Sequence, residues 1–375
     1  MLGAGLVLVL SNEAKEHMEK KIPKYMAVVE WAKEQIHNDK IAYGAKFHSE
    51  NELSKRFDVS RQTIRQAMGI LEQENILQRR QGSGTFVVYR PESRTLKTMN
   101  IGLISTYLDQ YIFPSIISGI ESVLTSHGYS MQMTLTHNRV ESEKQAIDLL
   151  REKGVDGIIA EPTKSALPSP NIDMYHQLYD QHMPLVFFNA YYPGTSFPHV
   201  CMDDQMAGKM AADYLISQGH RNILGLFQLD DLQGHLRYAG YMQALNQAGI
   251  LIRPDRVTWF ASEEREEFVQ DDNRFLNRLK DCTAVLCYND EIAFNVVRKV
   301  QEYGLDVPKD ISVIGIDDSN MSLLSAVPLT SIAHPGRLLG EAAARNVLRL
   351  IDDPTFDANV DFKPSLVIRE SVRRM

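Results

Sequence analysis

The chain has 375 residues, which exceeds one ordinary folding core and predicts two or three domains. Hydrophobic residues make up 44% and charged residues 23%, a composition that excludes fibrous and disordered classes. No apolar run approaches the roughly 20 residues of a membrane-spanning helix. Three cysteines are too few for a disulfide framework and match no zinc spacing. We therefore expect a cytoplasmic protein without membrane contact, metal or cofactor.

Residues 1–19 begin with an apolar stretch, Leu6–Leu10, that resembles the core of a signal peptide. No basic residue precedes this stretch, and charged residues rather than small ones follow it. We expect these 19 residues to be a non-essential extension, with Met18 as an alternative start.

Charge is distributed unevenly along the chain. Residues 20–90 hold 13 basic and 8 acidic side chains, a net charge of +5, whereas the whole chain carries −8. The remainder therefore carries −13. A basic segment on an acidic body is typical of a protein that contacts phosphate through one end only.

Residues 20–90 are expected to form a small domain that contains three helices. The first runs over 23–38 on a stripe of apolar residues. Ser49 and Glu52 form a capping-box pattern that opens the second helix. Ser60 is expected to cap a third helix that ends near Glu74.

The third helix has two distinct faces. Four apolar residues at helical spacing are expected to pack inward: Ile64, Ala67, Met68 and Leu71. The outer face carries Arg61, Gln62, Arg65 and Gln66. Arginine can form two hydrogen bonds with guanine and glutamine two with adenine in the major groove. For a lone helix, a solvated polar face would be the favoured explanation of this pattern.

The residues after the third helix favour the nucleic-acid interpretation. Two strand-like runs over 76–80 and 85–89 flank Gln81–Gly84, a turn whose glycines permit positive φ. A basic hairpin directly after a helix-turn-helix is a wing. We therefore predict a winged helix-turn-helix DNA-binding domain.

Three motifs of this domain resemble the GntR family of bacterial regulators: Ser49–Leu53, Val59–Ala67 and Gln81–Val87. The resemblance implies that a set of residues contacts operator DNA: Lys24, Arg61, Gln62 and Arg65, with Glu50 nearby. Lys24 is expected to reach a phosphate. The wing around Gln81 and Gly82 is expected to enter the minor groove.

Residues 91–99 are polar and aperiodic and are expected to form a linker. Beyond them, short apolar runs alternate with helical patterns. The expected strands lie at 101–104, 129–135, 155–160, 184–188, 222–227, 257–260, 283–287 and 311–316. The expected helices lie at 114–127, 142–153, 172–182, 235–248, 268–280 and 290–303. This alternation predicts parallel α/β sheets in two lobes with a cleft between them.

Polar residues gather where the predicted strands end. Asp203, Asn289 and Asp317 each follow a strand, and Arg237 opens a helix after another. Each residue alone is more typical of a cap or a turn. Together they indicate a sugar site, because carboxylates, amides and arginine can each pair with two adjacent hydroxyls. The aromatic rings of Tyr111 and Phe113 could cover the apolar face of a sugar.

Residues 100–372 resemble the effector domain of the LacI/GalR family, which has the periplasmic-binding-protein fold. The resemblance rests on Met202–Gly208, Gln218–Ile223, Tyr288–Ala293, Asp310–Asp318 and Leu329–Ile332. It implies sugar contacts from Asp203, Arg237, Asn289 and Asp317, with His334 lining the cleft.

The pairing of these two modules is similar to bacterial arabinose-operon repressors, and further stretches such as Glu161–Leu167 support that similarity. It implies a homodimer that binds palindromic operator DNA and is released by L-arabinose, with Glu161 among the effector contacts. A different sugar, or activation instead of repression, remains an alternative. A fused aminotransferase and a periplasmic binding protein are disfavoured by the short body and by the DNA-binding segment, and we expect no catalytic residue.

Overall fold

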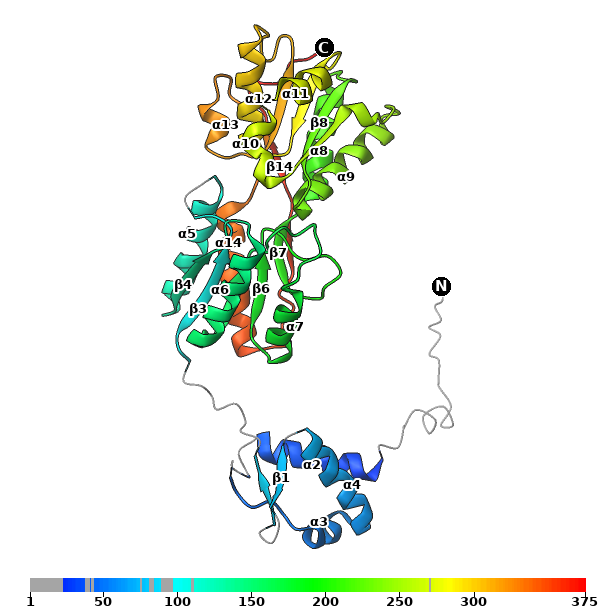
Figure 1. Cartoon of the computed structure of the whole chain (residues 1–375), viewed down its shortest axis with the longest axis vertical. Helices are drawn as coiled ribbons and strands as arrows, with labels where there is room; N and C mark the ends of the chain where they lie inside the picture. The colour runs from blue at the N-terminus through cyan, green and yellow to red at the C-terminus, as the bar shows by residue number, and fades with distance from the viewer. Residues whose placement is uncertain are drawn as a thin grey trace, which may run out of the picture. The chain divides into compact units, whose positions relative to one another are not determined.

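The structure is a computed structural model that describes residues 23–37, 41, 44–74, 76–80, 84–88, 97–108, 111–269 and 271–375. The chain divides into two compact units, Met1–Lys97 and Thr98–Met375 (Figure 1). The division falls inside the segment 91–99 that the sequence marks as a linker. Each unit is described by itself.

Among its described residues, the first unit contains three helices and an antiparallel hairpin. They are α2 (Lys24–His37), α3 (Glu50–Phe57), α4 (Arg61–Gln73), β1 (Leu77–Arg80) and β2 (Gly84–Val87). Glu52 N donates to Ser49 Oγ at 3.3 Å and Ser49 N donates to Glu52 Oε2 at 2.7 Å, so the capping box is confirmed. Ser60 Oγ accepts from Thr63 N at 3.2 Å and caps α4. All four apolar residues of the inner face of α4 are buried, as predicted.

The second unit has two lobes, each built on a six-stranded sheet. In the first lobe every neighbouring pair is parallel, in the order β13-β7-β6-β5-β3-β4. These strands are β3 (Asn100–Ser105), β4 (Ser130–Leu135), β5 (Gly157–Ala160), β6 (Leu185–Phe188), β7 (His199–Met202) and β13 (Val360–Phe362). The helices are α5 (Phe113–Ser126), α6 (Val140–Lys153), α7 (Ile172–Asp180) and α14 (Gly336–Asp352).

The second lobe has the strand order β14-β12-β11-β10-β8-β9, in which only β14 is antiparallel to its neighbour. The strands are β8 (Ile223–Gln228), β9 (Val257–Phe260), β10 (Ala284–Cys287), β11 (Ser312–Asp317), β12 (Thr330–Ala333) and β14 (Ser365–Val367). The helices are α8 (Asp204–Ser217), α9 (Leu232–Gln247), α10 (Arg265–Phe268), α11 (Asp272–Leu279), α12 (Asp290–Glu302) and α13 (Met321–Leu324), with 3₁₀ turns η1 (Pro254–Arg256) and η2 (Ser262–Glu264). The predicted fold class of two parallel α/β lobes is confirmed.

Two features differ from the sequence prediction. The helix expected over 268–280 begins only at Asp272, as α11, and the short α10 ends at Phe268 before it. Val269, between the two helices, and Phe275, on α11, both pack into the core. The chain also crosses between the lobes three times: after β7, after β12 and after β13. Because α14 and β13 return to the first lobe, each lobe is built from separate segments of the chain.

Candidate functional site

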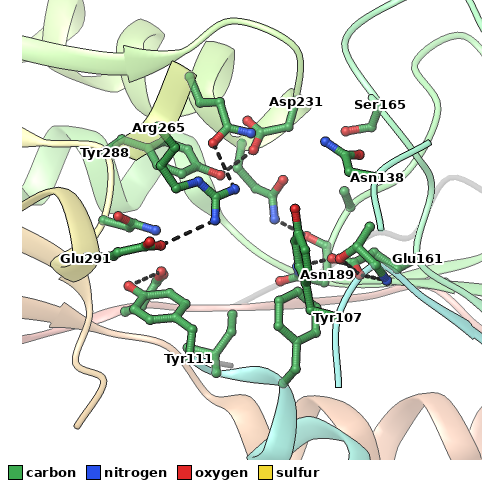
Figure 2. A pocket seen from close by; sticks show the side chains of 18 of the residues that line it. Tyr107, Tyr111, Asn138, Glu161, Ser165, Asn189, Asp231, Arg265, Tyr288 and Glu291 are labelled. Atoms are coloured by element: carbon green, nitrogen blue, oxygen red, sulfur yellow. Dashed lines mark hydrogen bonds and ion pairs between the residues drawn. The ribbon is translucent and has the colours of Figure 1, made fainter. Parts of the chain in front are cut away.

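A cavity of about 370 Å³ lies between the two lobes of the second unit. Polar and aromatic side chains of both lobes line it (Figure 2). Those of the first lobe include Tyr107, Tyr111, Phe113, Asn138, Glu161, Lys164, Ser165 and Asn189. Those of the second lobe include Gln228, Asp231, Gln233, Arg237, Arg265, Tyr288, Asn289, Glu291 and Asp317.

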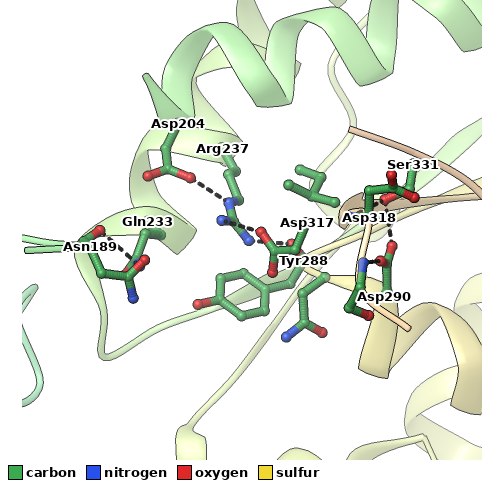
Figure 3. A network of polar contacts seen from close by, with 12 residues as sticks. Asn189, Asp204, Gln233, Arg237, Tyr288, Asp290, Asp317, Asp318 and Ser331 are labelled. Carbon is green, nitrogen blue, oxygen red and sulfur yellow. Dashed lines mark hydrogen bonds and ion pairs between the residues drawn. The ribbon is translucent and has the colours of Figure 1, made fainter. Parts of the chain in front are cut away.

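Arg237 is the centre of a buried charge network in the second lobe (Figure 3). Its Nε donates to Asp204 Oδ1 at 2.8 Å, and its Nη2 donates to Asp317 Oδ1 at 3.1 Å. Its Nη1 donates to the carbonyl oxygen of Tyr288 at 2.7 Å. Burial alone would lower the pKa of Arg237, but the two carboxylates outweigh it and hold that pKa well above its ordinary value. Arg237 is therefore a permanent, fully paired cation at the cavity wall.

Close packing of α8 against α9 brings Asp204 and Arg237 together. A Cβ added to Gly208 of α8 would lie 2.1 Å from the carbonyl oxygen of Arg237, and one added to Gly240 of α9 would lie 2.0 Å from that of Gln205. Only glycine permits this approach of the two backbones. The two glycines therefore set the distance across which the ion pair forms.

Tyr111 joins the first lobe to this network. Its hydroxyl donates to Asp317 Oδ2 at 2.7 Å and accepts from Asp290 N at 3.0 Å. Burial, reinforced by the charges of Asp317 and Asp290, raises the pKa of Tyr111 well above its ordinary value, so the phenol keeps its proton. Asp317 itself has a φ of 103°, a left-handed conformation that is costly for any residue except glycine. Asp317 is the last residue of β11, and its carboxylate contacts both Arg237 and Tyr111.

Asp290 supports the same end of the second sheet. Its carboxylate accepts from Ser331 Oγ at 2.6 Å and from Ser319 N at 2.7 Å. Burial raises its pKa to about 7. The adjacent Asn289 caps α12 by accepting from Ile292 N at 3.0 Å through Oδ1, which leaves its Nδ2 group for a ligand in the cavity.

Glu161 lies on the first-lobe wall, but neighbouring groups already occupy both of its oxygens. Thr106 N donates to Oε2 at 2.8 Å, and Asn189 Nδ2 donates to Oε1 at 2.8 Å. Burial raises the pKa of Glu161, and these hydrogen bonds only partly counter that shift. Glu161 therefore holds Thr106 and Asn189 in place and also lines the cavity, as Asp317 does.

Two expected contacts, Asp203 and His334, are not among the residues that line this cavity. Both lie where the chain crosses between the lobes. The carboxylate of Asp203 caps α8 by accepting from Met206 N at 2.8 Å. The backbone of His334 donates to the carbonyl oxygen of Asp317 at 3.2 Å, and burial lowers the pKa of its ring to about 4. Their positions fit the connections between the lobes better than direct contact with a ligand.

Sequence reasoning missed several cavity residues. Asp231 caps α9 and accepts a hydrogen bond from the hydroxyl of Tyr288. Arg265 Nη1 donates to Glu291 Oε2 at 3.3 Å, and its guanidinium lies 5.9 Å from the centre of the Tyr107 ring. Glu291 lies within Tyr288–Ala293, a stretch that the sequence analysis quoted, whereas Asp231 and Arg265 carried no sequence signal.

The candidate DNA-binding face belongs to the first unit. Arg61, Gln62 and Arg65 are exposed on α4, and Lys24 lies in a surface depression with Ser60 at the start of α4. The carboxylate of Glu50 accepts from Arg65 Nε at 2.9 Å and from Arg79 Nη2 at 3.1 Å. Glu50 therefore orients a helix arginine and a hairpin arginine together. Gln81 and Gly82 lie outside the described residues.

Two family models match the chain. Residues 24–87 match the bacterial regulatory proteins of the gntR family, and residues 212–372 match the periplasmic binding protein-like domain. Within the described residues, no helix is long and apolar enough to span a bilayer. No three acidic, histidine or cysteine side chains in that part of the chain form a metal-binding group. The class is thus a regulator with a winged-helix head and a two-lobed binding domain.

The chain is 38% identical over 360 residues to the arabinose metabolism transcriptional repressor of Halalkalibacterium halodurans, covering 93% of this chain and 96% of that protein. It is 36% identical to the repressor of the same name from Geobacillus stearothermophilus, over 95% of this chain and 100% of that protein. The chain belongs to this family of arabinose metabolism transcriptional repressors. A complex of the transcriptional regulator CelR with cellobiose shares the fold, with a TM-score of 0.66 and 23% identity over 83% of this chain and 90% of that chain.

Proposed function

We propose that this protein represses the transcription of L-arabinose utilisation genes and that L-arabinose releases it from operator DNA. Membership of the repressor family supports this proposal. The observation that carries it is the polar cavity between the lobes, which brings together a paired arginine, carboxylates and amides. Because the relatives are regulators, the proposal assigns no catalysis and places the protein in the cytoplasm with DNA.

The cavity has the chemistry of a sugar site. Sugar hydroxyls both donate and accept, so they can bond the free amide of Asn289 and the carboxylate of Asp317 together. Phe113 and Tyr107 pack edge to face with ring centres 5.8 Å apart and form an aromatic wall. Such a wall can cover the apolar face of a pyranose while the opposite wall bonds its hydroxyls.

We further propose that the protein acts as a homodimer. In α13, Leu323 and Leu324 are 63% and 75% exposed and offer an apolar surface that a partner subunit can cover. A dimer would present two winged helices to the two halves of a palindromic operator. Sugar binding must then weaken DNA binding, and DNA must weaken sugar binding by the same factor. The coupling free energy between two such sites is typically about 1–3 kcal/mol.

Operator binding measured by fluorescence anisotropy, with and without L-arabinose, tests the proposal. We expect tight binding of the operator in the absence of sugar and about 5-fold to 150-fold weaker binding in its presence. D-glucose and D-xylose serve as matched controls and should change little. Unchanged operator binding with every sugar would remove the effector role.

Because DNA is assigned to the first unit and the sugar to the second, Arg65→Ala should affect only DNA binding. This substitution should weaken operator binding by about 1–3 kcal/mol, because it removes a candidate base contact. L-arabinose affinity, measured by calorimetry, should stay unchanged. Arg298→Ala, on the exposed face of α12, is the matched control and should leave both affinities unchanged. A parallel loss of sugar affinity in Arg65→Ala would contradict the assignment of the two sites.

A further inference from the structure

One edge of the interlobe cavity is closed by a set of contacts that we call the interlobe latch. Its first-lobe residues are Asn138, Lys164, Ser165 and Ala166, and its second-lobe residues are Asp230, Leu232, Ser262 and Glu263. Three of them, Asn138, Lys164 and Ser165, also line the cavity. The latch is therefore a wall of the binding site as well as a contact between the lobes.

An ion pair across the cleft is the first component of the latch. Lys164 Nζ lies 3.5 Å from Asp230 Oδ2 and also pairs with Glu263. The side chain of Asp230 is only 4% exposed, and in the part of the chain that the structure describes Lys164 is its only cationic partner. If the lobes separated, Asp230 would lose its counter-charge but would keep the donors Ser262 N, at 3.1 Å, and Ser262 Oγ. The attraction between Lys164 and Asp230 across the cleft contributes to the closed arrangement.

Neutral hydrogen bonds form the second component. Asn138 Nδ2 donates across the cleft to Ser262 Oγ at 3.0 Å, while its Oδ1 accepts from Lys164 N at 3.0 Å. Leu232 N, in the first turn of α9, donates to Ser165 Oγ at 2.9 Å. Opening the lobes would leave this amide without an acceptor from the protein.

The loop that carries Lys164 is held rigidly from inside the first lobe. The fully buried carboxylate of Glu143 accepts from Thr163 N at 3.1 Å, and it also accepts from the hydroxyls of Tyr175 at 3.0 Å and Tyr192 at 2.9 Å. Lys164 has a φ of 46°, so its backbone is fixed in the left-handed region. Such a loop cannot easily move aside for a larger ligand.

We propose that Lys164 and the interlobe latch determine effector size: they admit a single sugar ring and exclude one that carries a second sugar at this edge. The inference rests on the proposed sugar-binding function. A glycosidic extension at the latch edge would have to break the Lys164–Asp230 pair and leave Asp230 buried without a cation. A monosaccharide fits inside the closed latch, and its binding gains from closure of the lobes.

Calorimetry on full-length Lys164→Met tests this, because methionine keeps the length of the side chain but removes the charge. The ligands are L-arabinose and α-1,5-linked arabinobiose. We expect L-arabinose affinity to fall about 5-fold to 10-fold, since the closed state is less populated. Arabinobiose, excluded by the unmodified protein, should gain measurable affinity. Lys209→Met removes a comparably exposed lysine paired with Asp213 on α8 and should bind both sugars as the unmodified protein does.

Thermal unfolding of the sugar-free Lys164→Met protein separates a loss of stability from a loss of sugar affinity, because the variant leaves Asp230 buried without its cationic partner. Asp230→Asn should reproduce the loss of L-arabinose affinity by removing the other partner. Unmodified selectivity in both variants would overturn the latch inference while leaving sugar binding intact. Failure of the unmodified protein to bind any sugar would instead remove the proposed function.

Discussion

The two lobes stabilise their buried carboxylates in different ways. In the first lobe Glu143 and Glu161 accept hydrogen bonds from neutral donors only, and burial raises the pKa of both. In the second lobe Asp204 and Asp317 share the guanidinium of Arg237. Glu143 and Glu161 of the first lobe are thus held by fixed dipoles, whereas Asp204 and Asp317 of the second lobe are held by a formal positive charge.

This difference indicates how the two walls of the cavity can act. A buried carboxylate held by several neutral donors, such as Glu143, keeps the remaining donors when one is lost. A wall built on one buried cation depends on every member, because removal of one leaves another charge uncompensated. We therefore expect substitutions in the second lobe to have the larger effects, and the predictions below test that ranking.

Arg237→Met should have the largest effect. It leaves Asp204 and Asp317 buried without a cation, which costs about 3–5 kcal/mol for a buried pair that loses one partner. Urea unfolding should show this loss, and calorimetry should show no L-arabinose binding. Arg337→Met, which breaks an exposed i,i+4 pair with Glu341 on α14, is the control and should change stability by less than about 0.5 kcal/mol. A stable Arg237→Met protein would show that the network contributes little.

In each lobe a glycine lies where two helices pack closely, Gly208 between α8 and α9 and Gly119 between α5 and α14, so the same substitution can be compared in both lobes. A Cβ at Gly208 would lie 2.1 Å from the carbonyl oxygen of Arg237 in the second lobe, and one at Gly119 would lie 2.3 Å from that of Arg337 in the first. Alanine at either position should cost about 1–3 kcal/mol through overpacking. Only Gly208→Ala displaces Arg237, so only this variant should also lose L-arabinose affinity.

Urea unfolding and calorimetry on both variants separate stability from binding. Gly69→Ala on α4 is the control, since a Cβ there has open space and alanine favours a helix by up to about 1 kcal/mol. Equal loss of sugar affinity in Gly208→Ala and Gly119→Ala would show that general stability, and not the position of Arg237, controls binding.

The sequence predicted the first unit well because its signals are local. The capping box of Ser49 and Glu52 and the two faces of α4 depend on residues within one or two helical turns. The site was harder to predict. Asp203 and Asp204 are adjacent, and only the phase of α8 decides that Asp204 turns inward to Arg237 while Asp203 caps the helix.

The connections between the lobes could not be predicted, for a different reason. Periodicity identifies strands and helices but not the sheet that each one joins. The return of α14 to the first lobe depends on the reciprocal fit of Gly119 and Gly340, which are far apart in the sequence. The pairing of Lys164 with Asp230 depends in turn on that arrangement of the lobes.

The last prediction is a pH dependence of stability carried by Asp290. Burial raises its pKa from an ordinary 3.8 to about 7, so the folded state binds a proton that the unfolded state releases between these values. The stability from this group is therefore fully present below pH 3.8 and is lost as the pH rises towards about 7. The free energy of unfolding changes by at most about 1.4 kcal/mol per pH unit through this group.

Urea unfolding between pH 5 and pH 7 should show that the free energy of unfolding depends less steeply on pH in Asp290→Asn than in the unmodified protein. The control Asp213→Asn, on the exposed face of α8, should keep the full slope. An unchanged slope in Asp290→Asn would mean that other groups, such as Asp204 and Asp231, whose pKa values burial raises to about 6, carry the pH dependence instead.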